Sequence, residues 1–342
     1  MKVLMVGGAG NISTAITRQL LARGDEISLF KRTASVPEWM GGIRVITGDR
    51  TDRARFRQAL AGEGPFDVVI DMICYEPEEA ACDVEVFRGK TKQFVFCSTV
   101  DVYSKTSVAY PIREDSPFGA VPSFEYAYRK VLCERLLWEA HERGDFALTV
   151  LRPAATYSES RSPGVHSFGG QTYHLDRLRR GKPFILHGDG MSVWVAAHSD
   201  DVSVPFTSAA GNPAAYGQAY NVTGDEWMTQ NRMWRIIARV LGAPEPDFVY
   251  IPADLLGRLA PREAKWCVEN FRYNNIFDNS KVKRELGFRY QIRFEEGARR
   301  SIEHLASQGL IESWENYPFY DRIVEAWRRH TAALVSEAGE KA

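Results

Sequence analysis

The sequence contains no run of about 18 apolar residues, so no segment is predicted to cross a membrane as a helix. It also lacks an excess of charge, because 43 Lys and Arg residues and 44 Asp and Glu residues leave a formal net charge of -1. No long basic run is present either, so no nucleic-acid partner is expected. The first residues predict a strand rather than a signal peptide, and we expect a cytoplasmic protein.

Cysteine is scarce, and the 5 residues include no CxxC pair. This pattern predicts free, mostly buried thiols, with neither a disulfide framework nor a metal site. Internal repeats and low-complexity linkers are absent as well. The remaining composition is ordinary for a globular enzyme, with 44% hydrophobic and 25% charged residues. A chain of 342 residues is long enough for a large α/β domain with a smaller domain attached.

The N-terminal segment has the pattern of a strand, a tight turn and a helix. An apolar run at 3–6 leads into the sequence GGAGNIS at 7–13, after which apolar residues recur at helical spacing. Glycines in such a turn let the backbone approach a pyrophosphate, and the following helix presents the positive end of its dipole. The segment therefore predicts a dinucleotide cradle. Its predicted contacts are Gly7, Gly10, Asn11 and Ile12.

Further apolar segments predict five more strands in the first half of the chain, at 26–30, 43–46, 66–72, 93–97 and 147–151. Segments of helical length separate them, and one of these helices is expected at 52–61. Strands that alternate with helices imply right-handed crossovers and a parallel sheet covered on both faces. We therefore predict an α/β fold with a doubly wound parallel sheet, and a smaller, mostly C-terminal α/β substrate domain.

The pattern changes beyond residue 153. A Ser- and Gly-rich loop comes first, and helices are expected further on, at 173–180, 199–210 and 230–241. Aromatic residues in the tail at 314–327 are expected to pack in a core or a subunit contact. We predict a dinucleotide-binding domain at 1–153, to which segments near 183–222 return, and a substrate domain at 154–182 and 223–342.

Three side chains have the spacing of a proton-transfer site. Tyr126 and Lys130 lie four positions apart in a predicted helix, so they share one face. An ammonium group beside a phenol favours the phenolate and lowers its pKa from the ordinary value of about 10. Thr99 follows the strand at 93–97, at the edge of the sheet where ligands bind. The structural alternatives are a surface tyrosine and a strand-capping threonine.

Together these motifs make the sequence similar to extended short-chain dehydrogenases of the NAD-dependent epimerase/dehydratase family. The matching segments are the glycine turn, STVDVY at 98–103, YAYRK at 126–130, LRP at 151–153, HGDG at 187–190, HSDDV at 198–202 and DNSK at 278–281. The resemblance implies a Rossmann sheet and catalysis by hydride transfer at a secondary alcohol or carbonyl of a sugar-like substrate.

The resemblance also implies roles for individual residues. Thr99 would hold the substrate oxygen, Tyr126 would move the proton, and Lys130 would bond the nicotinamide ribose. A homodimer would form through the helix near 78–87 and the helix that carries Tyr126. The alternative is a non-catalytic member that binds RNA or a protein partner, although the complete Thr99, Tyr126 and Lys130 set and the near-neutral charge argue against it.

Several departures from the family pattern concern the cofactor. Ser13 replaces the third glycine of the turn, and it is the next smallest suitable residue. Lys31 and Arg32 end the second strand, where NAD-dependent members carry an acidic residue on the ribose 2′-hydroxyl. Because cations attract a 2′-phosphate, NADP is the expected cofactor and NAD the alternative. Asp49, at the end of the third strand, resembles the family residue that bonds the adenine.

Other departures concern the substrate. Trp194 stands where nucleotide-sugar epimerases carry an arginine that clamps the diphosphate. An indole cannot neutralise a pyrophosphate but can stack on a sugar face. A nucleotide sugar is therefore not expected unless another arginine substitutes, the candidates being Arg177, Arg179, Arg180, Arg262 and Arg272.

Asp101 replaces the Asp-Glu pair of the dehydratases, so a full dehydratase is disfavoured. It is either an additional acid or base, or a turn carboxylate. The expected substrate contacts are Asp101, Tyr157 and Trp194.

Overall fold

The chain forms two compact units in the computed structural model, which describes residues 1–106 and 109–339. Unit 1 consists of 1–156, 197–225 and 276–292, and unit 2 of 157–196, 226–275 and the described residues from 293 onward. This division differs from the predicted domains at the short boundary segments 154–156 and 223–225, which lie in unit 1, and at two longer segments. Residues 183–196 lie in unit 2, and residues 276–292 return to unit 1.

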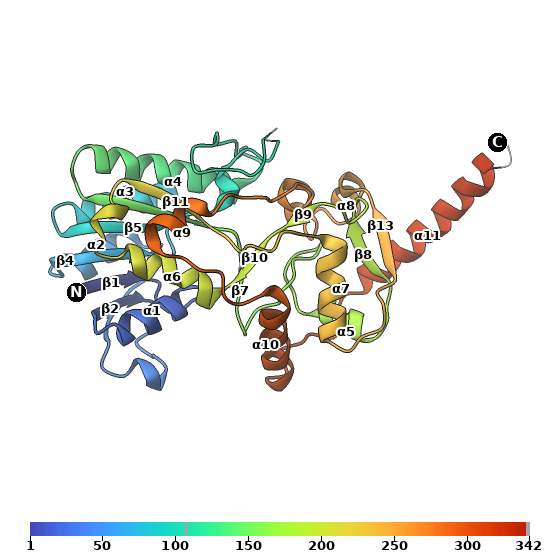
Figure 1. Ribbon diagram of the computed structural model, residues 1–342, viewed down its shortest axis with the longest axis horizontal. Helices are drawn as coiled ribbons and strands as arrows, with labels where there is room; N and C mark the ends of the chain where they lie inside the picture. The colour runs from blue at the N-terminus through green and yellow to red at the C-terminus, as the bar shows by residue number, and fades with distance from the viewer. Residues whose placement is uncertain (107–108, 340–342) are drawn as a thin grey trace. The chain divides into compact units, whose positions relative to one another are not determined.

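Unit 1 is built on a seven-stranded parallel sheet with the order β11-β6-β5-β4-β1-β2-β3 (Figure 1). The strands are β1 Lys2–Val6, β2 Glu26–Lys31, β3 Arg44–Thr47, β4 Phe66–Asp71, β5 Thr91–Cys97, β6 Ala147–Pro153 and β11 Gln218–Val222. All six predicted strands are present, and the doubly wound parallel sheet is confirmed. The strand order reverses beside β1, so the ligand crevice is expected where β1 and β4 end.

Helices cover both faces of this sheet. One layer consists of α1 Ser13–Ala22, α6 Ser199–Ala209 and α9 Ser280–Leu286, and the other of α2 Arg53–Leu60, α3 Pro77–Phe87 and α4 Glu125–Glu142. Alternate residues of β1 divide between the two cores: Val3 and Met5 face the first layer, and Leu4 and Val6 the second. All four are fully buried, which explains why β1 reads as an unbroken apolar run.

Unit 2 combines helices with short strand pairs. Its helices are α5 Tyr173–Arg179, α7 Gln230–Val240, α8 Ala253–Leu259, α10 Phe294–Ser307 and α11 Pro318–Gly339. Strand β8 (Phe184–His187) pairs with β13 (Phe248–Ile251), and β9 (Val193–Trp194) with β12 (Met228–Thr229). The pairing of β8 with β13 explains why residues 183–196 belong to unit 2. The remaining strands are β7 Ala155–Tyr157 and β10 Ala196–His198.

Five short helical turns complete the described elements. Four are 3-10 turns, η1 Glu38–Met40, η2 Val100–Val102, η3 Pro213–Ala215 and η5 Trp314–Asn316, and one is a π-helical turn, η4 Cys267–Phe271. Of these, η2 directly follows Thr99 and fixes the backbone at the mouth of the predicted site.

The core of unit 2 is unusually rich in histidine. His166 and His174 are fully buried, and their rings stack with centroids 3.8 Å apart. Burial lowers the pKa of both well below the ordinary value, so they are neutral core residues. Tyr320 from the aromatic tail is also fully buried, and its hydroxyl lies 3.1 Å from His166 Nε2. The tail therefore packs in a core, which is one of the two predicted alternatives.

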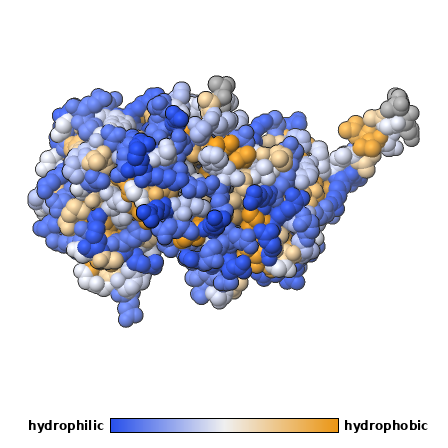
Figure 2. Space-filling view, in the orientation of Figure 1, coloured by the Kyte–Doolittle hydropathy of each residue, from blue (hydrophilic) through white to orange (hydrophobic). Residues whose placement is uncertain are grey.

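The surface hydropathy and the state of the cysteines can be compared with the expectations from the composition. No helix in the described part of the chain is long and apolar enough to cross a membrane. Hydrophilic side chains cover most of the visible face of each unit, whereas apolar side chains gather near the end of α11 (Figure 2). All the cysteines are free and buried, as predicted.

Candidate active site

The glycine turn after β1 forms the predicted cradle. Gly7 has a φ of 86°, which an L side chain rarely adopts. A Cβ added at Gly7 would lie 2.6 Å from Ile73 Cγ2, and one at Gly8 would lie 2.4 Å from Leu29 Cδ2. The turn therefore has no space for a side chain at either glycine. The turn opens into α1, whose positive dipole end suits a pyrophosphate.

Hydroxyl groups of α1 hold this turn in shape. Ser13 Oγ accepts a hydrogen bond from the Gly10 N–H at 2.6 Å, and Thr14 Oγ1 donates to the Gly10 carbonyl at 2.8 Å. Ser13 therefore stabilises the turn rather than merely fitting into it. Asn11 Nδ2 donates to the Thr156 carbonyl at 2.9 Å, so this side chain ties the turn to β7. The residues present fit a dinucleotide.

The predicted ribose and adenine contacts meet where β2 and β3 end. Arg32 is exposed and lines a surface pocket together with Asp49 and Arg55. Lys31 Nζ donates to the Ser35 carbonyl at 2.5 Å, which leaves Arg32 as the more accessible of the two predicted cations. Hydrogen bonds from Thr51 hold the pKa of Asp49 below its ordinary value, so the carboxylate is ionised. Arg55 was not predicted, because it lies on α2.

The structure brings Thr99 and Tyr126 together. Thr99 is 5% exposed, and its hydroxyl accepts a hydrogen bond from the Asp101 N–H at 3.2 Å. A side-chain hydrogen bond joins Thr99 to Tyr126, which lies in the first turn of α4. Tyr126 therefore presents its hydroxyl at the end of β5 and is not a surface tyrosine.

Lys130 lies one turn further along α4 and is 1% exposed. Its Nζ donates to the carbonyls of Cys74 at 2.8 Å and Cys97 at 2.7 Å. The net shift in the pKa of Tyr126 is upward, opposite to the effect expected from Lys130. Burial, followed by the charge of Asp101, raises the pKa of Tyr126 well above the ordinary value.

Asp101 lies beside the same phenol. Its carboxylate forms an ion pair with Lys105 at 2.8 Å, and both side chains are nearly buried. After burial, the negative charge of Asp101 is the next largest cause of the raised pKa of Tyr126.

The other two predicted substrate residues lie in unit 2. Tyr157 is 2% exposed, and its ring packs on Phe294 with centroids 5.8 Å apart. Trp194 is 5% exposed and packs edge-on against Phe271 at 5.4 Å. Both rings are thus part of the packing of unit 2, and any contact with a substrate would involve only a small part of their surface.

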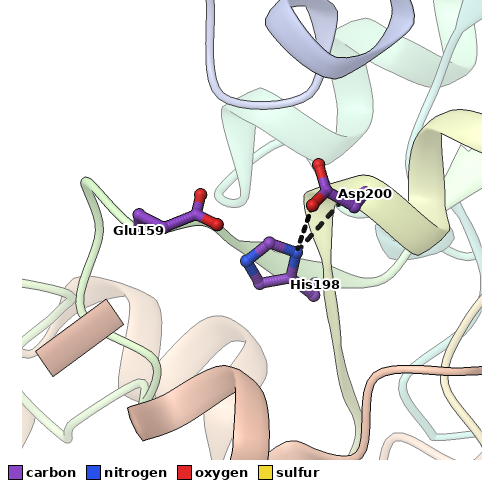
Figure 3. A group of neighbouring side chains, drawn as sticks. All are labelled: Glu159, His198 and Asp200. Atoms are coloured by element: carbon purple, nitrogen blue, oxygen red, sulfur yellow. Dashed lines mark hydrogen bonds and ion pairs between the residues drawn. The ribbon is translucent and has the colours of Figure 1, made fainter. Parts of the chain in front are cut away.

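The HSDDV motif at 198–202 has a structural role in unit 1. The His198 ring accepts a hydrogen bond from the Asp200 N–H at 3.2 Å and so caps α6, as Figure 3 shows for this pair. Asp201 accepts hydrogen bonds from the N–H groups of Gln291 and Ile292 at 3.0 and 2.8 Å. These bonds, together with the packing of α9 in the same core, explain why residues 276–292 return to unit 1.

Besides Arg55, a residue next to Tyr126 and Lys130 was missed by the sequence reasoning. The ring of Tyr75 lies next to both Tyr126 and Lys130. Tyr75 follows β4, at the same edge of the sheet as Thr99 after β5. That position was the available signal, because side chains that follow neighbouring parallel strands meet at one edge.

A comparison with protein families identifies the family of this chain. A family model described as the NAD dependent epimerase/dehydratase family matches residues 3–223. The chain belongs to the NAD dependent epimerase/dehydratase family. Membership confirms the resemblance seen in the motifs. It also supports an enzyme of the extended short-chain dehydrogenase type that binds NAD.

The names of similar proteins refer to different functions. The chain is 26% identical to the chloroplast stem-loop binding protein of 41 kDa b of Arabidopsis thaliana, over 94% of this chain and 84% of that protein. It is 25% identical to the 2'-dehydrokanamycin reductase of Streptomyces kanamyceticus, over 81% and 77%. The UDP-glucose 4-epimerase of Thermotoga maritima has the same fold, with a TM-score of 0.72, 20% identity and coverage of 90% and 99%.

Proposed function

We propose that the protein is an NADP-dependent oxidoreductase or epimerase that acts at a secondary alcohol or carbonyl of a sugar-like substrate. The observation that carries this proposal is the hydrogen bond between Thr99 and Tyr126, with Lys130 in the next turn of α4. A hydroxyl and a phenol that meet in this way can both contact one substrate oxygen. The position of the pair at the carboxyl ends of the strands, in the same unit as the cradle, supports the assignment.

The proton is handled by residues of this chain, while a bound nicotinamide would supply the hydride acceptor or donor. Tyr126 gives its proton to the substrate oxygen in reduction and takes it back in oxidation. Thr99 holds the same oxygen through its hydroxyl. Because burial raises the pKa of Tyr126, loss of its proton requires a positive charge nearby. Lys130 uses two of its three N–H groups on carbonyls, and we assign the third to the nicotinamide ribose.

The preference for NADP is carried by Arg32 and Lys31. Replacing both, as Lys31→Asp and Arg32→Asn, should weaken NADPH binding by about 1.5–3 kcal/mol for each charged hydrogen bond lost, and should spare NADH. Titration of nicotinamide fluorescence measures both affinities. Arg57→Gln is the matched control, because Arg57 lies on α2 and pairs with Glu85 instead of lining the pocket. An equal loss for NADPH and NADH would exclude a 2′-phosphate contact.

A substrate without a nucleotide diphosphate is favoured by the arginines of unit 2. Trp194 stands at the clamp position, and three of the possible substitutes are already paired, one of them Arg180 with Asp176 at 3.6 Å. Arg177 is fully buried and bonded to Asp321 at 2.6 Å, and Arg272 forms an ion pair with Asp254. Breaking the buried Arg177 pair to clamp a diphosphate would cost part of the binding energy. The exposed Arg272 pair would break at little cost.

We therefore expect UDP and GDP to show no micromolar binding in calorimetry. NADP⁺ added to the same sample is the control that the protein is competent to bind nucleotides. Micromolar affinity for either diphosphate would make the interpretation of Trp194 wrong. Sugars and polyols without a nucleotide would remain the class to test, and a change in nicotinamide absorbance on turnover would distinguish net redox from epimerisation.

The second candidate is a non-catalytic RNA-binding protein. It is motivated by the relative named as a stem-loop binding protein, and the near-neutral charge of the chain speaks against it. Salt-dependent RNA binding without turnover of any sugar-like substrate would favour this candidate. For the enzyme we further propose a cytoplasmic homodimer formed through α3 and α4, as the family resemblance implies.

A further inference from the structure

The ammonium group of Lys130 is surrounded by two backbone carbonyls and two aromatic rings. Besides its hydrogen bonds to Cys74 and Cys97, Nζ lies 4.7 Å from the ring centroid of Tyr75 and 4.8 Å from that of Phe96. Carbonyl oxygens and ring faces both present negative partial charge to a cation. Because Lys130 is 1% exposed, its charge depends on these contacts in place of water.

The two rings differ in their exposure to solvent. Phe96 belongs to β5 and is fully buried in the sheet, whereas 46% of the surface of Tyr75 is exposed. Of the two rings that contact the Lys130 ammonium group, Tyr75 is therefore the one that faces solvent. Its backbone is fixed, because its N–H donates to Glu79 Oε2 at 2.8 Å, the atom that also accepts from the N–H of Glu76 at the start of α3.

Tyr75 also lies beside the proposed proton donor. The ring centroids of Tyr75 and Tyr126 are 6.4 Å apart, with the planes tilted by 44°. One side chain thus contacts both Tyr126 and Lys130, although it comes from a different strand end. Partial burial raises the pKa of Tyr75 to about 12, so it is a neutral phenol in neutral solution. Its attraction for Lys130 is accordingly that of a ring face and not of a phenolate.

We propose that Tyr75 is a positioning residue, whose ring fixes the Lys130 ammonium so that the third N–H is directed to the cofactor ribose. This inference rests on the proposed function, because the ribose contact of Lys130 is part of that proposal. Hydrogen bonds to two carbonyls still allow the ammonium group of Lys130 to rotate about the line that joins the two oxygens. The rings of Tyr75 and Phe96 limit that rotation.

The test compares variants that keep the ring with one that removes it, using NADPH titration of the full chain. Tyr75→Leu should weaken NADPH binding by about 3- to 30-fold, whereas Tyr75→Phe should stay within about twofold of the wild type. Tyr75→Trp should also retain affinity, because indole is the strongest cation–π partner. Tyr75→Gln serves the same comparison if leucine at this exposed position causes aggregation. Equal affinities for the variants with and without the ring would overturn the proposal.

A double variant separates positioning from a general loss of structure. In a Lys130→Met background, Tyr75→Leu should cause no further loss of NADPH affinity, because the ring acts through the ammonium. Additive losses would show that Tyr75 acts independently of Lys130 and would overturn the proposal. If the wild type binds no nicotinamide cofactor, the proposed function fails. If it binds and Tyr75→Leu binds equally well, this inference alone fails.

Discussion

Tyr126→Phe should lower kcat by about 10²- to 10⁴-fold while the variant still folds and binds cofactor. The substitution removes only the hydroxyl that bonds Thr99. The ring remains, and with it the contacts to Phe124 and Tyr75, whose centroids both lie 6.4 Å away. Steady-state kinetics on the turned-over substrate, together with cofactor titration, measure the two effects separately.

Tyr128→Phe is the matched control, because it also removes a phenolic hydroxyl from α4. Tyr128 lies two positions after Tyr126, on a different face of the helix. This variant should keep nearly full activity. Thr99→Val should reduce the rate and spare cofactor binding, whereas Lys130→Met should reduce both. If Tyr126→Phe retains full activity, the proton travels through another group, and the proposed mechanism must be abandoned.

Much of the fold could be predicted because it depends on local patterns. Six of the seven strands of unit 1 were visible as apolar runs between helical segments, since both faces of the sheet are covered. The seventh, β11, was not predicted. The division into units was less accessible. Whether β8 pairs with β13, or α9 packs in the core of unit 1, depends on partners far away in the sequence. Periodicity shows that an element has an apolar face but not which core that face joins.

The same limit applies to the site. The spacing of Tyr126 and Lys130 placed both residues on one face of α4, and the end of β5 placed Thr99 nearby. The pKa of Tyr126 could not be predicted in this way, because burial and the charge of Asp101 act across the fold. The carbonyls that hold Lys130 belong to two different strand ends, and backbone groups leave no trace in a sequence motif. Tyr75 was missed for a related reason, since no motif includes it.

The second large effect is expected at Glu134, where Glu134→Ala should lower the free energy of unfolding by about 3–5 kcal/mol. Glu134 is fully buried on α4 and forms two hydrogen bonds with Arg152, at 2.9 and 2.6 Å. Ser98 Oγ donates to the same carboxylate. Removing it leaves the Arg152 guanidinium, which is 3% exposed, without its compensating charge.

Glu85→Ala is the matched control for this prediction. Glu85 forms an ion pair with Arg57 at 2.6 Å, but the two side chains are 58% and 45% exposed, so the loss should stay below about 1 kcal/mol. Equilibrium urea unfolding followed by circular dichroism compares the two variants. A similar cost for both would mean that burial adds nothing to the pair at Glu134.

Glu134 also gives part of the family motifs a structural role. Ser98 and Tyr103 begin and end the STVDVY segment, and Arg152 is the centre of LRP. Ser98 and Arg152 bond Glu134 directly, and Arg152 donates to the Tyr103 hydroxyl at 2.7 Å. Because Thr99 follows Ser98, loss of Glu134 should lower turnover as well as stability. Activity that survives intact in a destabilised Glu134→Ala variant would show that Thr99 is held in place without this network.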